Sequence, residues 1–350
     1  MEKQKKTLSV MVMTVLVSIL FFTGPTGAPQ TEAANPTPIY QLRYASHYVP
    51  EEMQNHAPRL WFEAVEKQTG GRVKVTPYYM ETLGKSTEML DNLKKGVSDI
   101  ATLAYVNYPG AFPITDVVSL PWLIPNQAIG TEVGYALQQK GLLDKELQGL
   151  KVLWWQATET TGLIFRRTKV TKLQDLKGMK IRTFAGAAQQ TLQALGATPI
   201  AIPGAEIYTA LDRGTVDGAL TNTGSFISRK FHEVSKYYLW VSVSMGVHLV
   251  VMNQSKWDSF PPDIKSIMEK LNAQAKYWFF DELTRRKYGL PGPVKETGVE
   301  VYYLSPDEEQ RWRKATEPMI NEWVSKMEAR GLPGKEAVKT IEEIAELYKM

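Results

Sequence analysis

The chain has 350 residues, of which 43% are hydrophobic and 22% charged, with a formal net charge of +4 and no cysteine. This is the composition of an ordinary globular protein long enough for two domains. Its basic and acidic residues are interspersed, which argues against a nucleic-acid partner or a polybasic membrane patch. The lack of cysteine excludes disulfides, a thiol nucleophile, cysteine-ligated metals and a lipid carried on an N-terminal cysteine.

The first 34 residues have the pattern of an export signal. A basic start, MEKQKK, precedes an apolar run from Leu8 to Phe22 and then small residues. A transmembrane anchor is the alternative, but a span needs about 20 apolar residues and this run is shorter. We therefore expect residues 1–34 to contain a signal peptide and its cleavage region, and the mature protein to be periplasmic.

Strands and helices alternate in the first part of the mature chain. Residues 39–45, 72–76 and 99–104 are predicted strands, and residues 51–69 and 87–95 are predicted helices. This alternation predicts an α/β fold with a largely parallel sheet.

A helix–glycine–strand unit occurs twice. Residues 88–101 align without gaps with residues 206–219, and the two segments share Glu, Leu, Gly, Asp and Ala at corresponding positions. This repetition predicts two similar lobes, the plan of a hinged solute-binding protein.

The last third of the sequence is mostly helical. Apolar residues recur at helical spacing from Pro262 to about Tyr288, which predicts a long helix able to lie along both lobes. A capping box at Ser305 begins a predicted helix that reaches about Ala329, and a final helix runs to Tyr348. We expect residues 35–157 plus about 247–290 to form lobe I, residues 158–246 lobe II, and residues 291–350 C-terminal helices packed on the lobes.

Motifs of catalysis and cofactor binding are missing from the sequence. The four histidines show no metal-ligand spacing, and we find no zinc-protease, serine-hydrolase, P-loop or dinucleotide pattern. The sequence thus disfavours an enzyme and predicts neither a metal nor a cofactor.

Several polar and aromatic residues follow predicted strands, where open α/β sheets bind ligands. His47, Tyr105 and Asn107 are candidates of this kind, although a solvated loop histidine and a structural Tyr-Pro-Gly turn explain them as well. Thr160 lies in a polar segment suited to a hinge or ligand loop. Trp240 is a candidate floor of a pocket, with core packing as its alternative.

Arg182 lies where a predicted strand meets a loop, in the segment DLKGMKIRTFAG of residues 175–186. Arginine keeps its charge, and its burial without a partner is expensive. On a cleft wall it can bind a carboxylate through two parallel hydrogen bonds. An exposed arginine, or one paired with Asp175, is the alternative. Phe184 follows, at the start of a helix whose first amides would add donors for an anion.

The segment DLKGMKIR resembles the D-L-K-G-x-K-x-R signature of substrate-binding proteins of tripartite ATP-independent periplasmic (TRAP) transporters, the C4-dicarboxylate-binding type. Residues 195–199 (LGATP) and 206–218 (EIYTALDRGTVDG) are similar to two further motifs of that family. In the first half, residues 71–73, 83–84, 96–99 and 120–122 match in kind and order.

The resemblance implies a two-lobe periplasmic solute-binding fold with hinge strands and a long C-terminal helix bracing both lobes. It implies that the protein closes on an organic acid, that Arg182 pairs with the ligand carboxylate, and that membrane permease subunits of a TRAP transporter receive the ligand. The hinge is expected near residues 156–162 and 244–247.

Two departures from the family pattern bear on the ligand. Many members carry an arginine in a G-x-R element, where this chain reads GLIF in residues 162–165. Many also read V-D-G-x-x-N, where this chain has Thr221 in place of the asparagine and Asn222 one residue later; both are ligand-binding candidates. We therefore expect a monocarboxylate with an apolar or aromatic body. A binding protein of an ATP-driven importer or sensor, and an exported α/β enzyme, are the alternatives.

Overall fold

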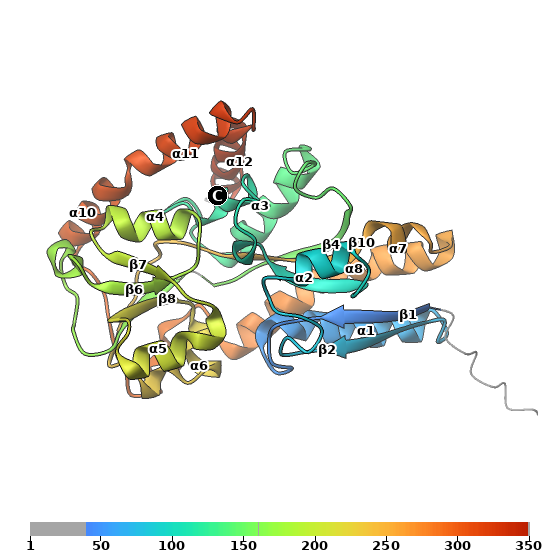
Figure 1. Cartoon of the computed structure of the whole chain (residues 1–350), viewed down its shortest axis with the longest axis horizontal. Helices are drawn as coiled ribbons and strands as arrows, with labels where there is room; N and C mark the ends of the chain where they lie inside the picture. The colour runs from blue at the N-terminus through green and yellow to red at the C-terminus, as the bar shows by residue number, and fades with distance from the viewer. Residues whose placement is uncertain (1–39, 160, 349–350) are drawn as a thin grey trace, which may run out of the picture. The chain divides into compact units, whose positions relative to one another are not determined.

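The computed structural model describes residues 40–159 and 161–348, and the predicted signal segment lies outside these residues. In the described part of the chain the strands form two mixed sheets, each with helices around it (Figure 1). The predicted α/β class is confirmed, but the sheets are mixed rather than largely parallel, because β10 (Val247–Asn253) and β5 (Gly162–Phe165) each run antiparallel to both of their neighbours.

The first sheet has the order β2-β1-β3-β10-β4. β1 pairs in parallel with β2 and β3, whereas β10 is antiparallel to β3 and β4. Its strands are β1 (Tyr40–Ala45), β2 (Val73–Tyr78), β3 (Ile100–Ala104), β4 (Leu150–Ala157) and β10 (Val247–Asn253).

The second sheet repeats this pattern of pairing in the order β7-β6-β8-β5-β9, with β11 added at the edge. β6 is parallel to β7 and β8, and β5 is antiparallel to β8 and β9. The two sheets therefore share one plan, except that β11 comes from the C-terminal segment. The strands are β5 (Gly162–Phe165), β6 (Lys180–Thr183), β7 (Thr198–Ala201), β8 (Gly218–Thr221), β9 (Tyr237–Leu239) and β11 (Glu300–Tyr302).

Helices cover both faces of each sheet. The α-helices of the described residues are α1 (His56–Gln68), α2 (Met89–Lys94), α3 (Gln127–Gln139), α4 (Ala187–Ala194), α5 (Ile207–Arg213), α6 (Thr223–Ser228), α7 (Gln254–Asp258), α8 (Pro262–Arg286), α9 (Pro291–Lys295), α10 (Pro306–Thr316), α11 (Pro318–Ala329) and α12 (Gly334–Leu347).

The repeated unit of the sequence becomes α2–β3 in one sheet and α5–β8 in the other. Gly96 (φ 74°) and Gly214 (φ 71°) both end their helices in the left-handed region, which a side chain disfavours. Asp99 and Asp217 then each accept a hydrogen bond at 2.8 Å from a backbone N–H of the adjacent parallel strand, β1 or β6. In both halves, therefore, the shared glycine ends the helix and the shared aspartate binds the backbone of the neighbouring strand.

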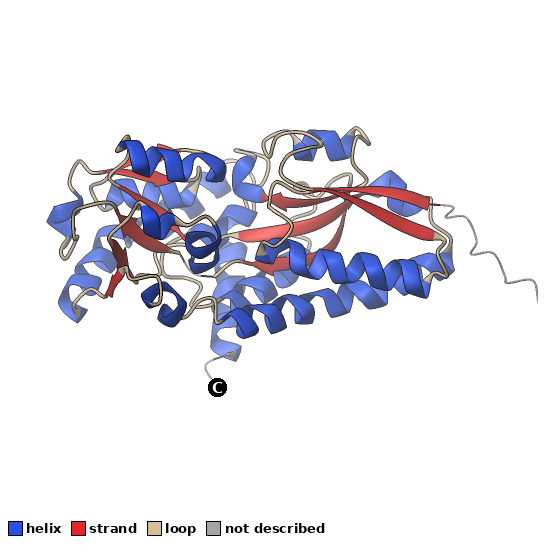
Figure 2. Cartoon of the chain, turned by 90° about the horizontal axis from the view of Figure 1, so that it is seen from below, coloured by secondary structure: helices blue, strands red, loops and turns tan. Residues whose placement is uncertain are grey.

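The cores lie on opposite faces of the strands because side chains alternate along a strand. On β4, Trp154 packs with α1 and α8, whereas Trp155 packs on the other face with α3. Figure 2 shows two long helices side by side along the first sheet; these are α1 and α8, which contact each other closely. α9 follows α8 and packs on α6, beside the second sheet.

The predicted helix from Ser305 to Ala329 is wrong in one respect, since it is two helices. α10 ends at Thr316 and α11 begins at Pro318. Proline has no backbone N–H to continue the hydrogen-bond ladder, and its ring clashes with the preceding turn.

Within the described residues the chain passes between the sheets three times: from β4 to β5, from β9 to β10, and from β10 through α7, α8 and α9 to β11. The first two of these connections are short. Residues 158–161 lead from β4 to β5, and residues 240–246 lead from β9 back towards β10. They lie together: the Thr158 N–H donates to the Gly246 carbonyl at 2.8 Å, and the Thr161 N–H donates to the Ser244 carbonyl at 3.1 Å. The crossings therefore lie at the residues expected for the hinge, while the boundaries of the lobes stay a prediction.

Among the residues that the structure describes, no helix combines the length and apolar character needed to span a membrane.

Candidate ligand-binding site

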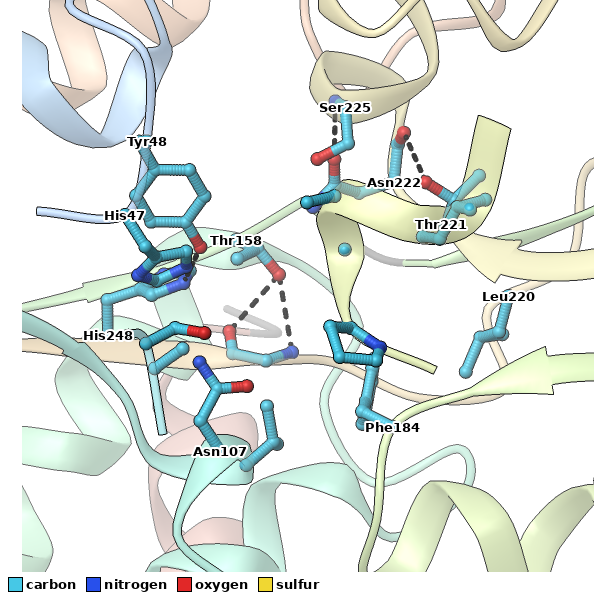
Figure 3. Close-up of a pocket in the computed structure, with 18 of the residues that line it drawn as sticks. His47, Tyr48, Asn107, Thr158, Phe184, Leu220, Thr221, Asn222, Ser225 and His248 are labelled. Atoms are coloured by element: carbon cyan, nitrogen blue, oxygen red, sulfur yellow. Dashed lines mark hydrogen bonds between the residues drawn. The ribbon is translucent and has the colours of Figure 1, made fainter. Parts of the chain in front are cut away.

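A cavity of about 140 Å³ lies at the carboxyl ends of strands from both sheets (Figure 3). His47 follows β1 and Asn107 follows β3 of the first sheet, while Phe184 follows β6 and Thr221 ends β8 of the second. Parallel strands place their carboxyl ends at one edge, where α/β proteins bind ligands. A cavity of this size accommodates a molecule of roughly the size of benzene, which suits a small organic ligand.

Arg182 is the buried cation of this cavity. β6 carries it between β7 and β8, and only 7% of its surface is exposed. Its Nε donates to the Ile202 carbonyl at 2.8 Å and its Nη1 donates to the Leu220 carbonyl at 3.1 Å. The guanidinium carbon also lies 5.9 Å from the centre of the Phe184 ring. These contacts hold the guanidinium plane at the cavity wall.

Within the described residues, no carboxylate pairs with Arg182. The Asp175 carboxylate instead accepts the backbone N–H groups of Thr171 and Lys172 at 2.9 and 3.1 Å, so the alternative pairing with Asp175 is wrong. Burial, together with the nearby Arg229, lowers the pKa of Arg182 to about 9, which still leaves a cation at neutral pH. A buried cation without a counter-charge is costly, and an anionic ligand would relieve that cost.

Two histidines and a tyrosine form the first-sheet side of the cavity. The rings of His47 and Tyr48 lie 3.9 Å apart, and the Tyr48 hydroxyl is 2.5 Å from Nε2 of His248 (Figure 3). Burial lowers the pKa of both histidines to about 3, with the Arg229 charge contributing at His47 and His47 contributing at His248. Both rings are therefore neutral at pH 7 and offer hydrogen-bonding nitrogens rather than charge.

The second-sheet side presents short polar side chains. Asn222 is the N-cap of α6, where its Oδ1 accepts the Ser225 N–H at 2.8 Å (Figure 3). Oδ1 thus caps the helix, and the side-chain NH₂ group of Asn222 is the part that can donate a hydrogen bond to a ligand. Thr221 also lines the cavity.

Thr158 and Gly246 bring the hinge segments to the same cavity. The Thr158 hydroxyl oxygen lies 3.2 Å from both the carbonyl oxygen and the N–H nitrogen of Gly246, and so ties the two crossing segments together (Figure 3). A ligand in the cavity would therefore touch both sheets and the crossings between them.

Of the residues predicted from the sequence, His47, Asn107, Arg182, Phe184, Thr221 and Asn222 line this cavity. Thr160 lies outside the described residues. Tyr105 is buried beneath the cavity wall, with its hydroxyl 3.2 Å from Oδ1 of Asp116, and it lines a neighbouring cavity instead. Trp240 is half-buried and packs on the Tyr238 ring at 5.7 Å, against the core of the second sheet. Tyr105 and Trp240 do not line the cavity because their side chains leave the strand ends in other directions.

The first amide of α4 does not face the cavity's ligand space as expected. The Ala187 N–H donates at 3.0 Å to Oδ2 of Asp116, a residue from the first-sheet side. Burial raises the pKa of Asp116 to about 6. A protein carboxylate thus occupies the position that the sequence suggested for a ligand anion.

Sequence reasoning missed Tyr48, Arg229 and His248. His248 offered a signal, because a histidine within the apolar strand GVHLVVM must be buried with a partner. The sequence pattern did not show which of the two adjacent cations, Arg229 or Lys230, faces the cavity.

Among the described residues, no three histidine, aspartate or glutamate side chains converge as a metal site.

The model of the family described as bacterial extracellular solute-binding protein, family 7, matches residues 45–327. The chain belongs to this family. Its resemblance to the substrate-binding proteins of TRAP transporters is confirmed, and with it the two-lobe fold of the family 7 solute-binding proteins. The family acts outside the cytoplasm, as its description states.

Among the relatives of this family 7 chain are two that are named for the acids they bind. A TRAP periplasmic solute-binding protein from Desulfovibrio salexigens is 27% identical, with a TM-score of 0.74, and the match covers 87% of this chain and 95% of that chain. A TRAP solute-binding protein from a marine metagenome, specific for aromatic acid ligands and crystallised with 3-hydroxybenzoate, is 25% identical, with a TM-score of 0.80 and coverage of 90% and 100%. The 2,3-diketo-L-gulonate-binding periplasmic protein YiaO of Escherichia coli is 25% identical over 314 residues, 87% of this chain and 92% of its own.

Proposed function

We propose that this protein captures a small organic acid, a monocarboxylate with an aryl or apolar body, in the periplasm and delivers it unchanged to the membrane permease subunits of a TRAP transporter. One observation carries the proposal. Arg182 is a buried cation in the wall of a small cavity, and no carboxylate of the described residues neutralises it. A ligand carboxylate can supply the missing charge through two parallel hydrogen bonds.

The rest of the lining supports an apolar or aromatic body. Phe184, Val106 and Leu220 contribute apolar surface, and the His47 and Tyr48 rings contribute flat faces. Aromatic rings stack or meet edge to face over such surfaces. The metagenomic relative that is specific for aromatic acids adds support from the family.

Closure is the proposed mechanism of capture. A ligand that touches groups on both sheets favours the closed form by its difference in affinity for the closed and open states. The paired crossings at Thr158–Gly246 and Thr161–Ser244 are the proposed hinge, where a few backbone torsions absorb the motion. No chemical change of the ligand is part of this mechanism.

Export and partners follow from the family rather than from the cavity. We infer that residues 1–34 direct the chain to the periplasm and are removed. Delivery to TRAP permease subunits is inferred from membership in family 7 and from relatives that are named TRAP binding proteins.

Calorimetric titration of the mature protein with benzoate, 3-hydroxybenzoate, succinate and malate tests the proposal. We expect an aryl monocarboxylate to bind with a dissociation constant in the micromolar range or below, about −8 kcal/mol or stronger. Recovery of the ligand unchanged after prolonged incubation separates binding from catalysis. Tighter binding of succinate or malate than of either aryl acid contradicts the proposed ligand class.

A further inference from the structure

A second arginine faces the same cavity, and a buried carboxylate holds it. Arg229 follows α6, on the second-sheet side, whereas Glu52 precedes a short helical turn at Met53–Asn55 on the first-sheet side. Nε of Arg229 lies 3.3 Å from Oε1 of Glu52, and Nη2 lies 3.3 Å from Oε2. This is a two-pronged ion pair between segments 177 residues apart.

The two partners differ in their access to the cavity. Arg229 lines it, while Glu52 lies behind Arg229 and is only 4% exposed. The charge of Arg229 reaches into the site, since it contributes to the lowered pKa values of Arg182 and His47. Two guanidinium groups therefore act on one small cavity, and only Arg229 has a carboxylate partner among the described residues.

We propose that Glu52 locks Arg229 in a neutral pair and thereby selects ligands that carry one negative charge. This inference rests on the proposed function, and it assigns the selection between monocarboxylates and dicarboxylates to Glu52. With Arg229 neutralised and both histidines uncharged, Arg182 supplies the single unbalanced positive charge among the residues that line the cavity. The remaining charged residue of the lining, Glu81, is half-buried and accepts the backbone N–H of Ser86. Water screens a charge in such a position more than one in the interior.

The physical reason is the cost of a buried charge without a partner. In the wild-type protein, a second ligand carboxylate near Arg229 would compete with Glu52, and one of the two carboxylates would remain unpaired. When Glu52 is replaced by glutamine, Arg229 loses its counter-charge. A second carboxylate of the ligand can then take that place, which a monocarboxylate cannot do.

The test compares the mature wild-type protein with Glu52→Gln by calorimetric titration, using two matched ligand pairs: benzoate with phthalate, and butanoate with succinate. We expect the ratio of dicarboxylate to monocarboxylate affinity to rise at least tenfold in Glu52→Gln. The neighbouring, exposed Glu51 provides the control, since Glu51→Gln should leave the ratio within a factor of two. An unchanged ratio in Glu52→Gln overturns the inference, as does a wild-type protein that already prefers the dicarboxylate in both pairs.

A second variant covers the case in which Glu52→Gln folds poorly. Arg229→Gln leaves the Glu52 carboxylate facing the site without its partner, so we expect monocarboxylate affinity to fall at least tenfold. The double variant Glu52→Gln/Arg229→Gln should regain most of that loss without gaining affinity for dicarboxylates. A pair that only latches the lobes together would instead weaken both ligand classes equally in all three variants, which overturns the proposal. Failure of the wild-type protein to bind any of the four acids counts against the proposed function itself.

Discussion

Replacement of Arg182 by methionine separates ligand binding from stability. Methionine keeps an unbranched apolar stem, but the guanidinium and its hydrogen bonds to the Ile202 and Leu220 carbonyls are lost. Loss of one partner of a buried charge pair with the ligand costs about 2–5 kcal/mol, a fall in affinity of roughly 30- to 5,000-fold. The free energy of unfolding should change far less. The two carbonyls lose net bonds of about 1 kcal/mol each, while removal of an unpaired buried cation offsets part of that loss.

Calorimetric titration with the best aryl acid and urea unfolding of the ligand-free protein measure the two quantities. Arg213→Met is the matched control, because Arg213 is exposed at the end of α5, and neither quantity should change appreciably. Arg182→Lys should lie between wild type and Arg182→Met, since it keeps the charge without the planar fork. An affinity within threefold of wild type, combined with a large loss of stability, would refute the assignment of Arg182 to the ligand.

Three further predictions concern stability. His47 and His248 have pKa values of about 3 in the folded protein, below the ordinary value of 6.5, so the unfolded chain binds more protons and stability falls as pH drops from 6.5 towards 3. Each histidine contributes up to about 1.4 kcal/mol per pH unit to this fall. In His248→Gln, the free energy of unfolding from urea titrations should therefore depend less steeply on pH than in wild type. An equal dependence on pH would contradict this prediction. Burial raises the pKa of Glu159 to about 7, so its contribution to stability falls as pH rises from 4.5 to 7. Glu159→Gln should therefore gain stability relative to wild type over that range, and a constant difference would count against it. Gly96→Ala and Gly214→Ala should both destabilise by about 1 kcal/mol because of their positive φ. Gly214→Ala should cost more, since its Cβ would displace the Arg166 guanidinium, whose Nη2 donates to the Asp212 carbonyl at 2.8 Å. Equal melting temperatures would contradict the ranking.

Local patterns predicted the elements that hold the site, but not every side chain that faces it. The strand that carries Arg182 and the turn at Asp175 follow from the order of residues in one short segment, and the structure places Arg182 in the cavity wall. Tyr105 and Trp240 were, by residue type, equally plausible as ligand-binding residues. The sequence did not specify which way a side chain leaves the end of a strand. Tyr105 turns into the protein interior, and Trp240 packs half-buried against the core of the second sheet.

Contacts between segments that are distant in the sequence could not be predicted from local sequence patterns. Glu52 and Arg229 meet only because the two sheets fold towards each other, and nothing near either residue indicates its partner. The same is true of Asp116, whose carboxylate binds the first amide of α4 from 71 residues away. The repeated unit was visible in advance because its glycine and aspartate act within a local helix–turn–strand segment.

The central claim is that the Arg182 guanidinium binds the carboxylate of the ligand. A crystal structure of the mature protein with benzoate or 3-hydroxybenzoate tests it most directly. We expect both carboxylate oxygens to lie within about 3 Å of guanidinium nitrogens of Arg182, as in other charge-assisted pairs, with the ring between Phe184 and the His47–Tyr48 side of the cavity. A carboxylate bound elsewhere, with Arg182 contacting only the Ile202 and Leu220 carbonyls, would contradict the account.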